Sequence, residues 1–209
     1  MLVGGAGLLL ARPTLAALPV PDAGHLTFKV TRNGDEIGSH AIAFTQSGDT
    51  LTVQVDVALA VKFGPITVYR YTHRDVEVYR GDELQSIETD SDDDGTPFAV
   101  RAQRQADGLH VQGTRAQPYI APADALPSSH WNRKVLDGSW INTQDGRLVR
   151  PQIKALGRGP ITTAEGQVQC DGFEITAPEV EMSSWYDGQA WCGVDFKGKD
   201  GSQINYIRL

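Results

Sequence analysis

The chain has 209 residues, a formal net charge of −7, 40% hydrophobic residues and 22% charged residues. These proportions are ordinary for a globular protein, and the length allows one domain or at most two small ones. The acidic balance and the lack of any Lys/Arg cluster exclude a nucleic-acid-binding surface, because phosphate contacts need a basic patch.

The first 17 residues differ from the rest and predict an export signal. Leu2–Ala11 is an apolar run that is too short for a membrane span of about 20 residues. It suits the h-region of a signal peptide, and Thr14–Ala17 offers small residues for cleavage. No basic residue precedes the run, so we expect a true start further upstream that carries a twin-arginine pair; a buried N-terminal helix is the alternative. No later segment is long and apolar enough to span a membrane.

We therefore expect a signal peptide over 1–17, a Pro-rich leader over 18–24 and a single β domain over 25–209. The mature protein is expected to be periplasmic or secreted. In an oxidising compartment two cysteines tend to pair, so we predict a disulfide between Cys170 and Cys192, with free thiols as the alternative. Closing this disulfide would raise the free energy of unfolding by about 3 kcal/mol. No CxxC or HxxxH spacing indicates a metal site, and no Gly-rich phosphate loop indicates a nucleotide, so no cofactor is expected.

Period-two patterns then predict strands in chain order. Leu26, Phe28 and Val30 alternate with polar residues, and Asn33-Gly34 is a strong hairpin-turn signal before a return strand over 37–44. An apolar residue occupies every second position over Leu51–Phe63. At about 3.3 Å per residue this strand is roughly 43 Å long, which favours a large curved sheet or a barrel.

The strand predicted over 66–79 has an unusual pattern. Tyr69, Tyr71, His73 and Asp75 share one face, with Glu77 in phase, whereas Val76 and Val78 lie on the other. This pattern indicates either a bulge or a polar patch in the interior. Shorter strands over 84–89, 97–105 and 109–113 follow, separated by turns, as in an antiparallel meander.

Residues 115–145 have no period and contain several prolines, so at most one short helix is expected, near 130–141. Such a long connection is usually functional or covers an open sheet edge. Further strands are predicted over 148–156, 161–163, 167–173, 179–186, 190–197 and 202–208. The predicted fold is all-β: a long antiparallel meander that forms a highly curved sheet or β-barrel.

Several segments together resemble a bacterial family of exported proteins of about 200 residues that is catalogued as a domain of unknown function. They are Tyr71-Thr72-His73, Glu77-Val78-Tyr79, Thr89, the Asp92–Gly95 turn, Ser129-His130-Trp131-Asn132, Asn142-Thr143-Gln144-Asp145-Gly146, Trp185-Tyr186-Asp187 and Asp200-Gly201-Ser202. The resemblance covers most of residues 25–209 and implies an antiparallel β fold without an established activity. The family is distantly similar to the half-barrels that carry lipoproteins across the periplasm. The two cysteines are not part of its pattern.

Two clusters are candidate sites. His73 lies between Tyr71 and Asp75, with Glu77 in phase, and a histidine in that setting can act as a general base; a hydrogen-bonded structural histidine is the plainer interpretation. Ser129, His130, Trp131 and Asn132 form either a structural plug with a bonded indole, a ligand site or a catalytic cluster, although no GxSxG elbow is present. Trp185 is expected to pack the core or line a pocket.

The leading functional hypothesis is non-enzymatic binding of an apolar or amphipathic small molecule or lipid in the cell envelope. The alternatives are a hydrolase or lyase that uses His73 or His130, and a protein-interaction module that uses a sheet edge or residues 115–145. The sequence leaves the oligomeric state open. Inward-facing Tyr71, His73 and Glu77 would favour a polar site, and outward-facing ones an apolar carrier.

Overall fold

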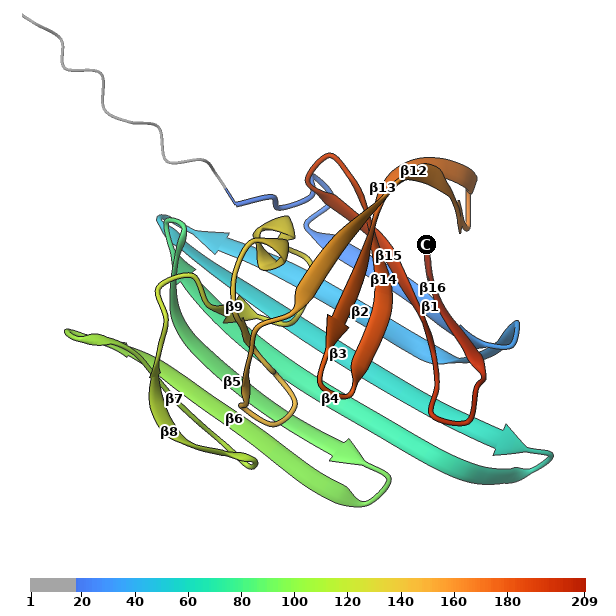
Figure 1. Ribbon diagram of the computed structural model, residues 1–209, viewed down its shortest axis with the longest axis horizontal. Helices are drawn as coiled ribbons and strands as arrows, with labels where there is room; N and C mark the ends of the chain where they lie inside the picture. Colours follow the sequence, from blue (N-terminus) through green and yellow to red (C-terminus); the bar gives the residue numbers. More distant parts are fainter. Residues whose placement is uncertain (1–17) are drawn as a thin grey trace, which may run out of the picture.

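The computed structural model describes residues 18–209 and is built around one antiparallel sheet of thirteen strands (Figure 1). The predicted signal peptide, residues 1–17, lies outside the described residues. Eight strands follow one another as a meander: β1 (His25–Arg32), β2 (Asp35–Ser47), β3 (Thr50–Phe63), β4 (Ile66–Arg80), β5 (Glu83–Asp93), β6 (Thr96–Gln105), β7 (Gly108–Gly113) and β8 (Ala116–Ala121). The predicted all-β class and antiparallel meander are confirmed.

A second meander completes the sheet on the other side of β1. It consists of β12 (Gln152–Thr163), β13 (Gly166–Ala177), β14 (Val180–Asp187), β15 (Ala190–Lys197) and β16 (Gln203–Arg208). β16 pairs antiparallel with β1, so the two meanders join at the first strand. β8 and β12 are the two ends of the strand order, and the sheet is therefore a curved, open one.

The connection between the meanders runs along the inside of the curve (Figure 1). It contains β9 (Leu126–Pro127), the short 3-10 helix η1 (Arg133–Leu136), β10 (Trp140–Ile141) and β11 (Leu148–Val149), with β9, β10 and β11 forming a small sheet. Of the described residues, η1 is the one helical element, which agrees with the expected short helix near 130–141.

Two strand predictions need correction. Residues 148–156 and 161–163 were expected to form separate strands, whereas β12 is continuous over Gln152–Thr163; it tolerates Pro160 because an edge strand needs fewer ladder donors. Residues 116–121, expected to be irregular, form β8. Pro118 lacks a backbone N–H and therefore argued against a strand at this position. β8 accommodates it because β8 is the other edge of the sheet.

The core lies between the inner face of the sheet and the connection. The alternating apolar residues of β3 point inward, and Leu51, Val53 and Val55 are almost completely buried. They belong to one cluster with Trp131 and Ile141 of the connection. The connection thus supplies the second layer that the curved sheet needs to bury its apolar face.

Candidate functional site

A cavity of about 380 Å³ lies between the inner face of the sheet and the connection. Apolar lining residues include Val55, Val57 and Leu59 of β3 with Met182 and Phe196 of the second meander. Polar lining residues come from the sheet, through His40, His73 and Asp93, and from the connection, through Ser128, Ser129, His130, Asn142, Thr143 and Gln144. The volume falls within the range of small-molecule sites.

Three buried histidines, His40, His73 and His130, line this cavity. Burial, with smaller contributions from the neighbouring His73 and His130, lowers the pKa of His40 to about 3. Burial also lowers the pKa of His73 to about 4, against a smaller opposing effect of Asp56, and that of His130 to about 4. All three rings are therefore neutral near pH 7.

Aromatic rings hold the histidines in place. His130 stacks on Trp191 with ring centroids 6.0 Å apart and meets Trp140 edge-on at 5.2 Å. His40 meets Trp191 and Tyr206 edge-on at 5.4 and 5.6 Å. His40 Nε2 and His130 Nδ1 are buried and have no hydrogen-bond partner within residues 18–209. Such atoms are costly unless a ligand or water pairs with them.

His73 differs because its Nδ1 contacts Ser91 Oγ at 2.7 Å. This is the distance expected between a general base and a hydroxyl nucleophile. Ser91 is buried on the neighbouring strand β5 and is not among the residues that line the cavity. The bond therefore anchors the imidazole against the sheet.

A buried carboxyl pair lies further along β4, beneath the plug residue Trp131. Asp75 and Glu77 are both 0% exposed. Glu77 Oε2 accepts hydrogen bonds from Trp131 Nε1 at 2.9 Å and from Tyr79 Oη–H at 2.8 Å. Burial raises the pKa of Asp75 well above its usual value, and the charge of Glu77 raises it further.

The remaining oxygens of this pair, Asp75 Oδ1 and Oδ2 and Glu77 Oε1, have no donor within the described chain. Burial also raises the pKa of Glu77, although the polar groups of Ser129, Trp131, Tyr79 and Asp75 act in the opposite direction. Because two adjacent buried carboxylates cannot both be ionised, we expect the pair to hold one proton, and a proton on Asp75 would supply the donor that Glu77 Oε1 lacks.

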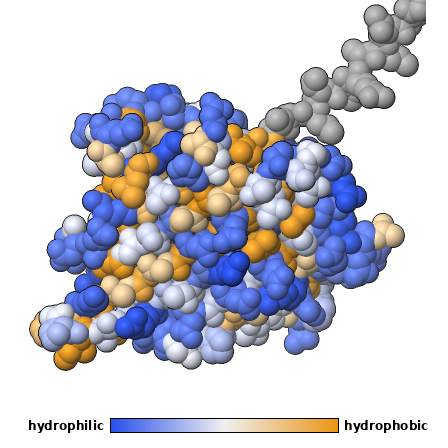
Figure 2. Space-filling model, turned by 180° about the vertical axis from the view of Figure 1, so that it is seen from behind, coloured by the Kyte–Doolittle hydropathy of each residue, from blue (hydrophilic) through white to orange (hydrophobic). Residues whose placement is uncertain are grey.

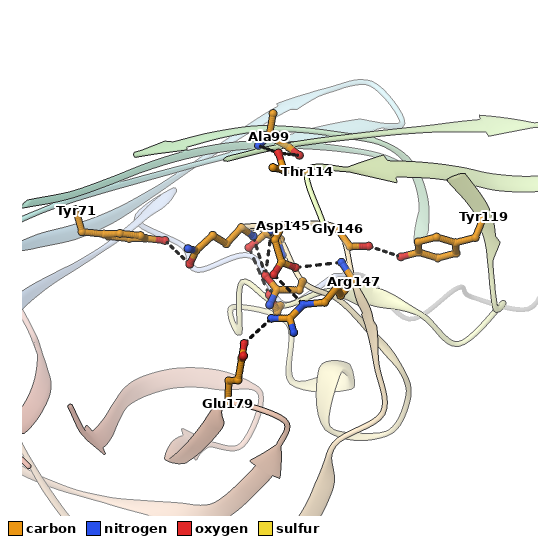
Figure 3. Close-up of polar contacts among 12 residues, drawn as sticks. Tyr71, Ala99, Thr114, Tyr119, Asp145, Gly146, Arg147 and Glu179 are labelled. Atoms are coloured by element: carbon orange, nitrogen blue, oxygen red, sulfur yellow. Dashed lines mark hydrogen bonds and ion pairs between the residues drawn. The ribbon is translucent and has the colours of Figure 1, made fainter. Parts of the chain in front are cut away.

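The loop over 142–147 ties the connection to both meanders beside the cavity (Figure 3). Tyr71 Oη donates to Gln144 Oε1 at 3.4 Å, and Tyr119 Oη donates to the Gly146 carbonyl at 3.0 Å. Arg147 bonds both Asp145 and Glu179 at 2.8 Å. This part of the polar lining is thus held by β4, β8 and the turn after β13.

Most of the site residues predicted from the sequence lie either at the cavity or directly beneath it. Tyr71, His73, Ser129 and His130 meet at the cavity, although they come from β4 and from the connection. Glu77 and Trp131 form the buried bond beneath it. Tyr71, His73 and Glu77 thus face inward, which was the outcome expected to favour a polar site.

Two further predicted residues, Asn132 and Trp185, lie away from both the cavity lining and the Glu77–Trp131 bond. Asn132 caps η1, with its Oδ1 accepting from the Lys134 amide at 3.1 Å. Trp185 packs across Gly159 and Gly172 on the sheet face opposite to Tyr186, and its Nε1 donates to Asp195 Oδ2 at 2.7 Å. The structure brings Cys170 and Cys192 together as buried thiols with Sγ atoms 2.6 Å apart.

Sequence reasoning missed His40 and Tyr206. His40 is in phase with Ile42 and Phe44 on the inner face of β2, and a histidine in register with inward apolar residues was the available signal. Tyr206 offered no such signal, because β16 reaches the site only through its pairing with β1.

Comparison with known proteins agrees with this fold. A crystal structure described as a beta-barrel-like protein of domain of unknown function DUF1849 from Brucella abortus superposes with a TM-score of 0.61 at 9% sequence identity, covering 93% of this chain and 98% of that one. At that identity the likeness shows the fold alone. No curated protein matches. Residues 28–209 match the family model described as "Domain of unknown function (DUF6134)", and the chain belongs to this family.

Proposed function

We propose that the protein binds one uncharged amphipathic small molecule in the cavity, without chemical turnover. The observation that carries this proposal is a cavity of about 380 Å³ whose lining combines apolar side chains with the neutral imidazoles of His40, His73 and His130. A ligand with an apolar body and a hydrogen-bonding group matches both kinds of lining residue.

The charges of the lining favour a neutral ligand. Among residues 18–209, no Lys or Arg lines the cavity, and the histidines carry no charge near pH 7 because their pKa values lie at about 3 to 4. Asp93, the one acidic lining residue in this part of the chain, accepts a hydrogen bond from Tyr69 Oη at 2.8 Å. An anionic headgroup would enter a low-dielectric site without a counter-charge, which is unfavourable.

Two fluorophores test both parts of the proposal. N-phenylnaphthylamine is uncharged, and anilinonaphthalene sulfonate has the same aromatic body with an added anionic group. We expect N-phenylnaphthylamine to bind saturably at one site per chain and the sulfonate to bind at least tenfold more weakly, as measured by fluorescence titration.

Variants on two faces of β3 locate the binding. Leu59→Trp fills the cavity and should weaken N-phenylnaphthylamine binding at least tenfold. Ala58→Trp places the same indole on the exposed outer face of the strand and should leave binding unchanged. Equal affinities of the two variants, or tighter binding of the sulfonate, would reject the proposal.

A hydrolase is the second candidate, and the contact of His73 Nδ1 with Ser91 Oγ favours it. The lowered pKa of His73 makes the ring a weak base, and Ser91 is not in the cavity lining. We therefore expect no turnover of a panel of uncharged esters. Ester hydrolysis that is lost in His73→Ala or His130→Ala would establish the enzyme instead.

A further inference from the structure

The tip of the β3–β4 hairpin carries bulky apolar side chains into solvent. Phe63 is 79% exposed, Ile66 62% and Val68 55%. Among the described residues these three form the one close group of exposed large apolar side chains in sequence; the others lie singly, at Ile120, Leu148, Leu156, Val168 and Leu209. Single exposed apolar residues are ordinary, whereas a group on one feature indicates an interaction site.

The tip projects beyond the neighbouring strands. The ladder between β2 and β3 ends at Leu59, and the ladder between β4 and β5 begins at Tyr71, so the outer part of the hairpin is a two-stranded extension. It is the far end of β3 and β4 at the lower right of Figure 1. In Figure 2 the corresponding lower-left projection ends in apolar atoms.

An apolar track connects the tip to the cavity. Val55, Val57 and Leu59 line the cavity, and Val61 and Phe63 continue the same inward face of β3 toward the turn. Across the ladder, Phe63 pairs with Ile66 and Val61 pairs with Tyr69, which itself lines the cavity. The inward side chains of β3 are therefore apolar from Val55 to Phe63, across the register shift of the ladder between Val61 and Lys62.

We propose that the β3–β4 tip inserts into a lipid bilayer and that the ligand reaches the cavity from the membrane along this inner face of β3. The inference rests on the proposed function for the nature of the cargo. The contact with the membrane depends on the tip alone.

The shape of the tip favours a bilayer over a protein partner. A stable protein interface buries about 800 Å² on each partner, which the few side chains of one hairpin turn cannot supply. A bilayer needs no complementary surface, and apolar side chains at the end of a projection reach its hydrocarbon layer.

Charge contributes little to this contact. Lys62 and Arg70 flank the tip, and Asp93 and Asp94 of the next turn lie against Tyr69 and Arg70. Because the two signs balance, insertion should not require anionic lipid and should persist at high salt.

Flotation with phosphatidylcholine vesicles tests the contact. The wild-type chain is expected to float with the vesicles at low and high salt. In Phe63→Ser/Ile66→Ser the partition coefficient should fall at least tenfold, because each bulky apolar side chain contributes on the order of tenfold. The matched control Leu156→Ser/Val168→Ser removes exposed apolar groups from β12 and β13 and should float like the wild type.

Transfer of N-phenylnaphthylamine from vesicles to the protein tests the route. The tip variant should load at least tenfold more slowly from vesicles, yet bind the probe with wild-type affinity in vesicle-free buffer. Absent flotation of the wild type, equal losses in the tip and control variants, or an unchanged loading rate would overturn the inference. Flotation without any probe binding would support the membrane contact and reject the cavity function, so the two failures are distinguishable.

Discussion

At the scale of single residues, the two cysteines are brought together by strands that are not neighbours. Cys170 lies on β13 and Cys192 on β15, with β14 between them. Cys192 is the extra residue where the register shifts between β14 and β15, so its side chain turns toward Cys170. Both thiols are buried, and the predicted disulfide is compatible with this arrangement.

We predict that the oxidised chain is lighter than the reduced chain by two hydrogens and more stable than Cys170→Ala/Cys192→Ala by about 3 kcal/mol. Single Cys170→Ala and Cys192→Ala variants should resemble the double variant, because one thiol alone cannot bridge the strands. Urea unfolding with and without reductant measures the difference. If reductant leaves the difference in unfolding free energy between the wild type and the double variant unchanged, the cysteines act as packed thiols.

At the scale of elements, the cavity depends on how closely the loop over 142–147 approaches β7. A Cβ added to Gly113 would lie 2.4 Å from the Asp145 carbonyl oxygen and 2.6 Å from Gly146 Cα. Gly146 has a φ of +84°, which favours glycine, and its own Cβ would meet Gly113 Cα at 2.7 Å. Two glycines thus let the connection lie directly on the strand.

Gly113→Ala should therefore push the loop away from the sheet and lower the unfolding free energy by about 1–3 kcal/mol, the usual cost of overpacking. Gly159→Ala is the matched control, because its Cβ would meet Trp185 at an ordinary 3.6 Å and should cost less than about 1 kcal/mol. Urea unfolding of both variants measures this. Equal stabilities would mean that the loop does not rest on β7.

At the scale of the whole molecule, the sequence predicted what depends on local pattern. The alternation in β3 and the turn at Asn33-Gly34 indicated the meander, and Tyr71, His73 and Glu77 stood out because polar residues in phase signal a polar interior. The pairing of β16 with β1, and the path of the connection inside the curve, depend on long-range contacts that leave no periodic signal. His40 and Tyr206 join the site only through that closure.

Buried histidines and buried carboxyl groups, whose pKa values shift in opposite directions, should also set how the unfolding free energy depends on pH. The folded-state pKa values of His40, His73 and His130 lie below the ordinary 6.5, so their contribution is present above pH 6.5 and is lost as pH falls toward 4. The folded-state pKa values of Asp75 and Glu77 are raised, so their contribution is present below about pH 4 and is lost as pH rises through those values.

Three histidines outweigh one shared carboxyl proton between pH 4 and 6.5, so the unfolding free energy should rise with pH over this interval. Asp75→Asn preserves the side-chain shape and removes the buried proton that opposes this rise. The rise should therefore be steeper in Asp75→Asn, by at most about 1.4 kcal/mol per pH unit. Urea unfolding of both proteins from pH 4 to 6.5 measures the two slopes, and parallel curves would show that Asp75 does not carry the buried proton.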